Sequence, residues 1–335
     1  MRFSRPYSLR ELSYFLNADL VLRYGSLSSC VNGLSDFFSY SSFDVIVFNN
    51  LNYLDYLMNI NVGLIVLKSE YVCKTSMNCL VIDNPRLALA KLSSLCFNFD
   101  LFKGGIEKSV FVGLNTIVSD ISKVCDNVVI GSNVEIKDNS FISPGSVIGN
   151  NCIIGSNCFL GSNVVLGDNV VIGNRSCIGS NSTIGGDGFG FVKNDFFGWE
   201  KINHFGGVVI GNDVDIGSNT SVDRGVFHNT IISDGVLIGN QVQIAHNVFV
   251  GRNTVMAGCI GVGGSTYIGS ECLIGGGVMI RDHIFISHRV CVSGSSSVTR
   301  SINKSGFYSS VFPVTNSYNW NKQLHYFYKL KDLFI

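Results

Sequence analysis

The sequence predicts a mainly β protein, in which a long parallel β-helix lies between a small α/β domain and a C-terminal helix. Three observations support this prediction: apolar residues recur at every sixth position over most of the chain, glycine commonly follows them, and asparagine often stands three places after them. Asparagine and glycine best tolerate a positive φ, so a corner is expected in every repeat. Three short strands and three corners then form a coil of about 18 residues, and residues one coil apart lie above one another on the same face.

Residues 1–103 come first and lack the repeat, so we predict a separate α/β domain there. Ser8 followed three residues later by Glu11 is a capping-box signature for the start of a helix. The stretches FDVIVFNN and VGLIVLKS are typical of strands on either side of a helical segment, LDYLMN. The last stretch, LVIDNPRLALAKLSSLCF, predicts a strand that turns into a helix with Pro85 in its first turn.

The β-helix is predicted over residues 104–305, and its inward positions are read directly from the spacing. They are Val112, Val118, Val124, Ile130, Ile136, Ile142, Ile148, Ile154, Leu160, Leu166, Ile172, Ile178 and Ile184, then Ile210, Ile216 and Val222, then Ile232, Ile238, Ile244, Val250, Met256, Val262, Ile268, Ile274, Ile280, Ile286, Val292 and Val298. We interpret these residues as core. Cys152 and Cys158 are interpreted as small core residues and not as metal ligands.

Two insertions interrupt the coils: residues 185–207, and a four-residue slip near DRGVFHNTI. Loops that leave a rigid scaffold are the usual place for function. The first insertion is rich in glycine and aromatic residues, which suits a loop beside a long apolar ligand. A loop that closes a subunit interface would have a similar composition, so both interpretations stay open.

Residues 306–335 form the predicted C-terminal extension, which contains a helix. One face of this helix would carry the apolar residues Trp320, Leu324, Phe327, Leu330 and Phe334. A lone helix of this length is marginal in water, so it is expected to pack against something. Solenoids of this kind commonly form trimers, and three such helices could bundle at one end.

The composition excludes several classes of protein. Of the 335 residues, 46% are hydrophobic and 14% are charged, which indicates an ordered chain. Lys plus Arg equal Asp plus Glu at 24 each, so the net charge gives no indication of nucleic-acid binding. The 11 cysteines form no CxxC pair, and neither a signal peptide nor a membrane-spanning apolar run is present. We therefore expect a reduced, cytoplasmic protein without a transmembrane segment.

His246, in the stretch GNQVQIAHNVFVGRN, is the candidate catalytic residue within the repeat. It stands two residues after the inward Ile244, and Gly264 occupies the same slot one coil later. A neutral imidazole there could take a proton from an attacking amine or hydroxyl, while a backbone N–H stabilises the oxyanion. His283 lies 37 residues beyond His246 and is expected near the same edge. The remaining histidines are expected to be merely solvated: His204, His228, His288 and His325.

Four motifs in a fixed order give the chain a resemblance to a known family. They are IGGDGFGFV at 184–192, SVDRG at 221–225, IGNQVQIAHNV at 238–248 and IGGGVMIRDHIFI at 274–286. The chain resembles the UDP-3-O-(3-hydroxyacyl)glucosamine N-acyltransferases, which are left-handed β-helix enzymes of lipid A biosynthesis built from hexapeptide repeats. The resemblance implies a cytoplasmic homotrimer that moves a 3-hydroxyacyl chain from acyl carrier protein to the 2-amino group of UDP-3-O-acylglucosamine. It implies no metal and no cofactor.

The same resemblance assigns roles to residues of the β-helix. His246 matches the general base, and Gly264 matches the glycine whose N–H lies at the oxyanion. His283 matches a histidine near the substrate, and Gln243 stands where it could orient the base or the substrate. The insertion residues that would border the groove for the acyl chain and the pantetheine arm are Asp187, Phe189 and Phe191.

In the N-terminal domain the resemblance implies a uridine-nucleotide site, with an aromatic residue, an asparagine and a tyrosine around the uracil. Asn50 and Tyr53 have the matching spacing, but Val47 stands in place of the aromatic residue. Phe48 follows it, and strand neighbours point to opposite faces, so Phe48 does not simply replace Val47. Uracil stacking is therefore expected to rest on Tyr53 alone.

A basic patch in the late coils is the expected contact for acyl carrier protein, which is acidic. Arg300 is the residue chosen from this patch, which also contains Arg281, Arg289 and Lys304. The C-terminal helix is short for the family, so its contact with the carrier protein is expected to be reduced.

Three alternatives remain at this point. The sister O-acyltransferases act on UDP-N-acetylglucosamine, but they generally lack an N-terminal domain, whereas residues 1–103 precede the repeat here. A metal-dependent β-helix enzyme of the γ-carbonic-anhydrase type needs three converging histidines. His246, His283 and His288 do not share one slot of the coil, which counts against such a site. The last alternative is a structural solenoid whose histidine is incidental.

Overall fold

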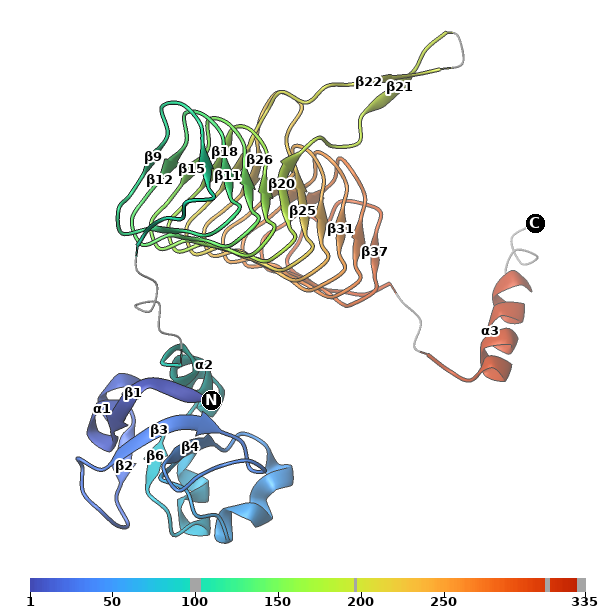
Figure 1. Cartoon of the computed structure of the whole chain (residues 1–335). Helices are drawn as coiled ribbons and strands as arrows, with labels where there is room; N and C mark the ends of the chain where they lie inside the picture. The colour runs from blue at the N-terminus through green and yellow to red at the C-terminus, as the bar shows by residue number, and fades with distance from the viewer. Residues whose placement is uncertain (97–103, 196–197, 311–313, 330–335) are drawn as a thin grey trace. The chain divides into compact units, whose positions relative to one another are not determined.

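The computed structural model describes residues 1–96, 104–195, 198–310 and 314–329 (Figure 1). The chain divides into two compact units, residues 1–102 and residues 103–335. The first is an α/β domain, and the second is a parallel β-helix followed by a C-terminal helix. The predicted fold class is confirmed.

One six-stranded sheet forms the centre of the first unit, with the strand order β1-β3-β4-β5-β6-β2. Its strands are β1 (Arg2–Ser8), β2 (Asp19–Val21), β3 (Cys30–Ser35), β4 (Asp44–Val47), β5 (Leu64–Leu67) and β6 (Cys79–Val81). Neighbours from β3 to β6 are parallel, whereas β1 and β2 pair antiparallel at the two edges. The carboxyl ends of the four parallel strands therefore meet at one edge of the sheet.

Among the described residues of this unit, two α-helices and two 3-10 helices accompany the sheet: α1 (Leu9–Leu16), α2 (Pro85–Ser94), η1 (Leu51–Met58) and η2 (Ser69–Lys74). The predicted capping box starts α1, since the Glu11 N–H donates to Ser8 Oγ and the Ser8 N–H donates to Glu11 Oε2. Pro85 opens α2 as predicted, and Asn84 caps it by accepting from the Leu87 N–H. The strands and helices predicted for this unit are confirmed.

Both faces of the sheet are covered by apolar side chains. Val45 and Val47 of β4 belong to a buried cluster with side chains of α1 and α2. Ile46 and Phe48 belong to a second cluster, with Leu57 of η1. The alternation follows the two-residue period of a strand, so Val47 and Phe48 do point to opposite sides.

Three parallel sheets form the β-helix in the part of the chain that the structure describes (Figure 1). The first contains β7 (Gly105–Ile106), β10 (Lys123–Val124), β13 (Phe141–Ile142), β16 (Phe159–Leu160), β19 (Cys177–Ile178), β24 (Asp215–Ile216), β27 (Leu237–Ile238), β30 (Val255–Met256), β33 (Leu273–Ile274), β36 (Val290–Val292) and β38 (Gly306–Tyr308). The second contains β8 (Phe111–Val112), β11 (Val129–Ile130), β14 (Val147–Ile148), β17 (Val165–Leu166), β20 (Thr183–Gly186), β25 (Ser221–Asp223), β28 (Gln243–Ile244), β31 (Gly261–Val262), β34 (Met279–Ile280) and β37 (Ser297–Val298). The third contains β9 (Ile117–Val118), β12 (Glu135–Ile136), β15 (Ile153–Ile154), β18 (Val170–Ile172), β23 (Val208–Ile210), β26 (Thr230–Ile232), β29 (Phe249–Val250), β32 (Tyr267–Ile268) and β35 (Phe285–Ile286).

Strand pairing follows the predicted coil. Val129 of β11 pairs with Val147 of β14, one coil later, and its neighbours pair in the same register. Asn133 and Asn139 turn corners with φ values of 58° and 55°, as expected for residues that tolerate this region. The inward residues from Val124 onward are buried in one continuous cluster, and burial of each such side chain is worth about 1.5–3 kcal/mol.

The first coil departs from the prediction. Val112 was expected in the core but is 39% exposed, and Val118 is only half-buried. These residues lie on β8 and β9, the terminal strands of their sheets, so only one neighbouring coil covers them.

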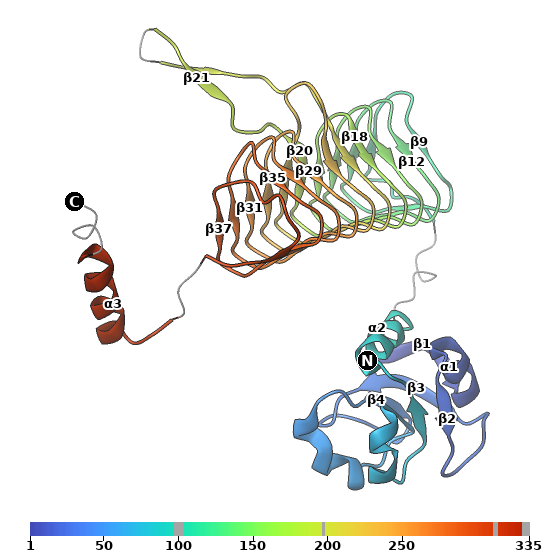
Figure 2. The same cartoon turned by 180° about the vertical axis from the view of Figure 1, so that it is seen from behind.

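The two predicted interruptions are observed as an arm and a bulge. The arm leaves the coils after β20 and carries the antiparallel hairpin of β21 (Phe191–Lys193) and β22 (Trp199–Lys201), before the chain returns at β23 (Figure 2). The slip lies between β25 and β26 and adds four residues to one coil. As a result, Ile216 of β24 pairs with Ile238 of β27, which lies 22 residues later in the sequence where an uninterrupted coil has 18. Both insertions leave the coils that precede and follow them in register.

The C-terminal extension contains α3 (Ser317–Lys329). Trp320 and Phe327 are 39% and 60% exposed, and Leu324 is half-buried. The other two residues of the predicted apolar face, Leu330 and Phe334, lie outside the described residues. No described helix is both long enough and apolar enough to span a membrane.

Candidate active site

His246 lies at the corner between β28 and β29, where the second sheet gives way to the third. Its ring is half-buried, and Nδ1 is 3.1 Å from Oδ1 of Asn247. The opposite edge of the ring faces Gly264, because a Cβ built on that glycine would lie 2.7 Å from Nε2. The ring is thus held at Nδ1, and Nε2 is directed at the next coil.

Gly264 occupies the slot one coil after His246, as the periodicity predicts. Its carbonyl accepts from the His283 N–H at 2.9 Å, whereas its own N–H makes no hydrogen bond with any described residue. Only glycine fits beside the imidazole here, since any side chain would collide with the ring. A nitrogen base and a free backbone donor therefore lie next to each other, which is the arrangement that acyl transfer requires.

A buried carboxylate lies one coil before His246, and the sequence-based prediction did not single it out. Asp223, at the end of β25, is 8% exposed and accepts a hydrogen bond from Gln243 Nε2 at 2.9 Å. Burial raises the pKa of Asp223, while the hydrogen bonds from Gln243 and Ser221 and the nearby His246 and His204 act in the opposite direction. Gln243 therefore connects to the site through Asp223. Asp223 stands within the SVDRG motif, and a carboxylate directly after an inward Val222 is the signal that could have identified it.

His204 is the second residue that the prediction missed. It was expected to be solvated, but it is 5% exposed, and its ring meets that of His246 edge to face with centroids 5.3 Å apart. Its Nδ1 lies 3.0 Å from the Ile202 carbonyl, while Nε2 has no hydrogen-bond partner among the described residues. The prediction failed because the returning strand of the arm folds back onto the corner, where Gly188 and Gly190 leave room for the ring.

Three other predicted residues lie on the arm: Asp187, Phe189 and Phe191. Asp187 forms an ion pair with Lys201, and the hydrogen bond from that lysine lowers the pKa of Asp187. Phe189 and Phe191 contact each other with ring centroids 5.2 Å apart and are 82% and 41% exposed. They present an apolar surface on the arm.

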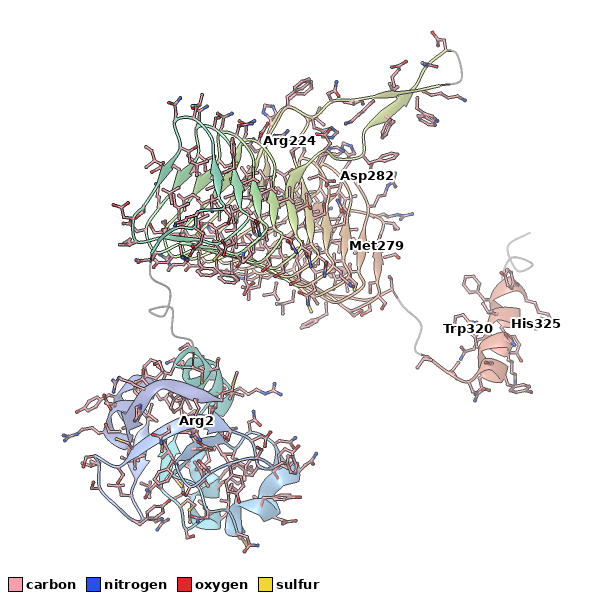
Figure 3. All side chains as sticks on the ribbon, in the orientation of Figure 1. Arg2, Arg224, Met279, Asp282, Trp320 and His325 are labelled. Atoms are coloured by element: carbon pink, nitrogen blue, oxygen red, sulfur yellow. The ribbon has the colours of Figure 1, made fainter. Side chains whose placement is uncertain are left out.

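His283 lies near the same edge but not in the same column as His246. Asp282, which is labelled in Figure 3, takes the slot two coils after His246 by strand register, and His283 follows it at the left-handed corner position with φ 55°. The His283 side chain is 71% exposed, and its Nε2 is 4.0 Å from the Asp282 carboxylate. It is therefore accessible to a ligand at this edge.

The predicted basic patch is partly paired with acidic side chains. Arg281 lies 3.6 Å from Asp282, and Arg289 lies 2.8 Å from Glu271. Arg300 is exposed at the corner after β37. Within the described residues, no three His, Cys, Asp or Glu side chains are grouped so that they could hold a metal ion.

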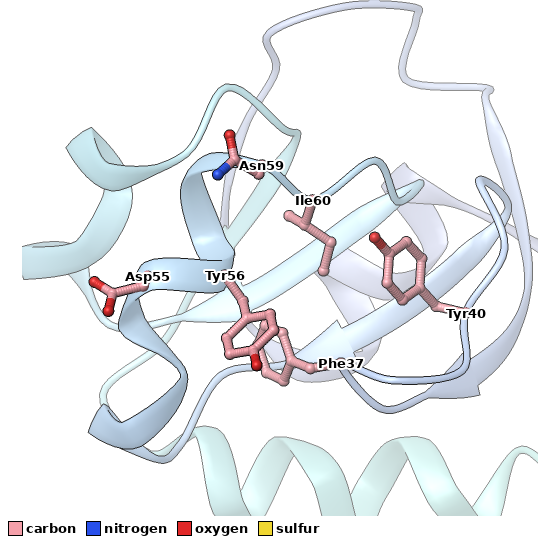
Figure 4. Close-up of a pocket in the computed structure, with 6 residues that line it drawn as sticks. All are labelled: Phe37, Tyr40, Asp55, Tyr56, Asn59 and Ile60. Carbon is pink, nitrogen blue, oxygen red and sulfur yellow. The ribbon is translucent and has the colours of Figure 1, made fainter.

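In the first unit, Asn50 and Tyr53 do not line the same pocket. Asn50 lines a pocket of about 510 Å³ at the carboxyl edge of the parallel strands, and its Oδ1 accepts from the Asn52 N–H. The ring of Tyr53 instead stacks on Phe37 at 5.3 Å. Phe37 also lines a smaller, neighbouring pocket with Tyr40, Asp55, Tyr56, Asn59 and Ile60 (Figure 4).

The larger pocket has its own aromatic residues. Phe48 and Tyr71 both line it, and their rings meet edge to face at 4.9 Å. Stacking of uracil on Tyr53 alone stays a prediction. The pocket also contains Asn49, Leu51, Lys68, Glu70, Asp83, Asn84, Pro85 and Arg86. It combines aromatic rings, amides and two cations at the edge where parallel α/β sheets usually bind ligands.

The chain is similar to several known proteins. Residues 151–186 match the family of bacterial transferase hexapeptides (six repeats). A UDP-3-O-acylglucosamine N-acyltransferase from Coxiella burnetii is 36% identical over 281 residues, which covers 84% of this chain and 82% of the relative. The enzyme of the same name from Delftia acidovorans is 41% identical over 136 residues, which covers 41% of this chain and only 40% of the relative. A solved UDP-N-acetylglucosamine O-acyltransferase from Moraxella catarrhalis is 20% identical, with a TM-score of 0.49, and covers 65% of this chain and 77% of that chain.

Proposed function

The chain belongs to the UDP-3-O-acylglucosamine N-acyltransferase family, and we propose that it transfers a 3-hydroxyacyl chain to the 2-amino group of UDP-3-O-acylglucosamine in lipid A biosynthesis. The observation that carries the proposal is the pairing of His246 Nε2 with Gly264, whose N–H is free, in adjacent coils. The acyl donor in this proposal is acyl carrier protein, which presents the chain as a thioester on its pantetheine arm. No metal or cofactor takes part.

His246 acts as the general base in the proposed reaction. The amine nitrogen attacks the thioester carbon while Nε2 accepts a proton from it, and the Gly264 N–H donates to the oxyanion of the tetrahedral intermediate. The intermediate then collapses, the C–S bond breaks, and the proton passes to the departing thiolate. The products are an amide and a free thiol, and the base returns to its neutral form.

Residues around this pair would bind the reactants. His283 is exposed at the same edge and could contact the nucleotide sugar, while Gln243 holds Asp223 beside the base. Phe189 and Phe191 provide an apolar surface for the acyl chain and pantetheine, beside Asp187 on the arm. A homotrimer would complete the acyl groove between adjacent subunits, and Arg300 would contact the acidic carrier protein.

The first unit would bind the uridine nucleotide. Its larger pocket supports this assignment, since Tyr71 could stack on a base while Lys68 and Arg86 could neutralise a diphosphate. Asn50 lines the same pocket and could contact the uracil. Tyr53 would support the wall of this pocket indirectly, because it stacks on Phe37, and Phe37 contacts the lining residue Phe48 with centroids 6.1 Å apart.

The experiment that tests the function is N-acylation of UDP-3-O-acylglucosamine with a 3-hydroxyacyl carrier-protein donor. Native protein should form the amide and release free thiol, and His246→Ala should lose about a hundredfold to ten-thousandfold in kcat, the range of a general base. His288→Asn is the matched control, because this exposed histidine accepts the Ser270 N–H and asparagine can do the same. Near-native turnover in His246→Ala would contradict the base, and an inactive native protein would contradict the acceptor.

A further inference from the structure

Asn247, which follows the candidate base, makes hydrogen bonds through its backbone N–H and through both ends of its side-chain amide. Its Oδ1 accepts from the Val226 N–H at 3.0 Å, and its Nδ2 donates to the His228 carbonyl at 3.0 Å. Its own N–H donates to Thr230 Oγ1 at 2.9 Å, and Oδ1 also lies 3.1 Å from His246 Nδ1. The side-chain amide is therefore held at both its oxygen and its nitrogen.

The two backbone partners determine which end of the amide is the oxygen. A backbone N–H only donates and a carbonyl only accepts, so Oδ1 must face Val226 and Nδ2 must face His228. An amide oxygen has no proton to donate, so its hydrogen bond with His246 requires a proton on Nδ1. The neutral imidazole then carries its lone pair on Nε2, at the edge that faces Gly264.

We propose that Asn247 is a positioning residue, which holds neutral His246 in the Nδ1–H tautomer and so leaves Nε2 free to accept a proton. The catalytic value of this tautomer rests on the proposed function, in which Nε2 removes the proton of the amine. The tautomer itself follows from the hydrogen bonds alone. Asn247 is uncharged, so it orients the ring without adding a negative charge beside it.

The four-residue slip contains both backbone partners of the Asn247 amide. Val226 and His228, whose backbone groups orient the amide, both lie in the stretch between β25 and β26 where the register breaks. An uninterrupted coil has no additional N–H and carbonyl at this place. Backbone groups of the slip therefore fix the orientation of the Asn247 amide, and the Asn247 amide in turn fixes the orientation of the His246 imidazole.

Asparagine suits the position for two reasons. Its φ of 59° lies in the left-handed region, which asparagine tolerates better than most residues. Its amide both accepts and donates, as the Val226 N–H and the His228 carbonyl require. Aspartate would keep the acceptor for Val226 and His246 but lose the donor to His228, and alanine would lose both.

The direct test is ¹⁵N NMR of the full-length protein with labelled histidine, recorded at a pH where the imidazoles are neutral. The spectrum distinguishes a protonated from an unprotonated ring nitrogen, and His246→Ala assigns the signals. We expect His246 to carry its proton on Nδ1 in the native protein and in Asn247→Asp, and to become a mixture of tautomers in Asn247→Ala. A native His246 protonated on Nε2 would overturn the proposal. This readout does not depend on turnover, so it separates failure of the tautomer assignment from failure of the proposed function.

Kinetics supply the second test. Asn247→Ala should lower kcat about tenfold, the loss expected for one hydrogen bond that orients a catalytic group, and Asn247→Asp should recover most of that loss. Asn219→Ala is the matched control, because Asn219 is an exposed corner asparagine with φ 56° and lies away from the site. If kcat falls equally in Asn247→Ala and Asn219→Ala, Asn247 acts only as a residue that stabilises its corner, and the positioning role is overturned.

Discussion

Gly264→Ala adds a single methyl group between the candidate base and the candidate oxyanion donor. The new Cβ would lie 2.7 Å from Nε2, 2.8 Å from Cε1 and 3.3 Å from Cδ2 of His246. Non-bonded heavy atoms pack at about 3.5 Å or more, so the imidazole would have to retreat by roughly 0.8 Å.

The ring has little freedom to make this movement. Its Nδ1 is bonded to Asn247, and the buried ring of His204 packs against it edge to face, with centroids 5.3 Å apart. A misplacement of about 1 Å can cost about a hundredfold in rate, so we expect kcat to fall by about two orders of magnitude. The thermal midpoint should change little, because β31 keeps its pairing with β28 and β34.

The assay is steady-state N-acylation combined with thermal unfolding of each variant. Gly276→Ala is the matched control, because Gly276 also stands two residues after an inward residue, and its added Cβ would approach the Gly258 carbonyl oxygen no closer than 3.3 Å. A near-native kcat for Gly264→Ala would refute the packing argument. If the loss of activity is accompanied by a large fall in the thermal midpoint, the substitution unfolds the coil, and this result too would refute the displacement of the imidazole as the cause.

Three further predictions concern the nucleotide pocket and two carboxylates. Tyr71→Ala should raise KM for the nucleotide sugar with little change in kcat, and Tyr71→Phe should retain the native KM; an unchanged KM in the alanine variant would mean that the base binds elsewhere. Burial raises the pKa of Asp223, so ionisation of this carboxyl lowers the stability of the folded protein as pH rises through the acid range. Asp223→Asn should therefore raise the thermal midpoint at neutral pH but not at low pH. A lower midpoint for this variant at neutral pH would contradict the prediction. The hydrogen bonds from Arg5 and Ser8 lower the pKa of Glu11 from 4.5 to about 2, so its contribution is complete above pH 4.5 and disappears as pH falls toward 2. The protection factors of the α1 amides, which correct for the intrinsic rate of hydrogen exchange at each pH, should fall over that range in native protein, and Glu11→Gln should remove this pH dependence.

The coils and their contacts could be predicted because the six-residue spacing encodes them directly. One inward Ile or Val fixes the face of its whole strand, so the position of Gly264 beside His246 followed from counting 18 residues. The exception was the first coil, where Val112 has the right spacing but lacks a coil on one side. Burial there depends on neighbours that the local pattern does not specify.

The parts of the site that lie outside the repeat were harder to predict. His204 belongs to the arm, and no periodicity indicates that the returning strand brings it against His246. The slip was recognised as a register break, but the backbone groups that it presents to Asn247 depend on the conformation of the bulge. Tyr53 lies on η1, whose turns direct it toward Phe37, and sequence spacing alone does not specify this contact.

The pairing of residues one coil apart also makes the β-helix a spacer of adjustable length. Removing residues 130–147 would join Val129 to Ile148 and place each later strand beside a neighbour of the same register. The site would keep its own contacts, since each coil contacts only the coils next to it, but it would lie about 4.8 Å closer to the beginning of the β-helix. The distance between the first coil and His246 is therefore set in whole coils, and insertion or loss of a coil changes it without altering the chemistry at the corner.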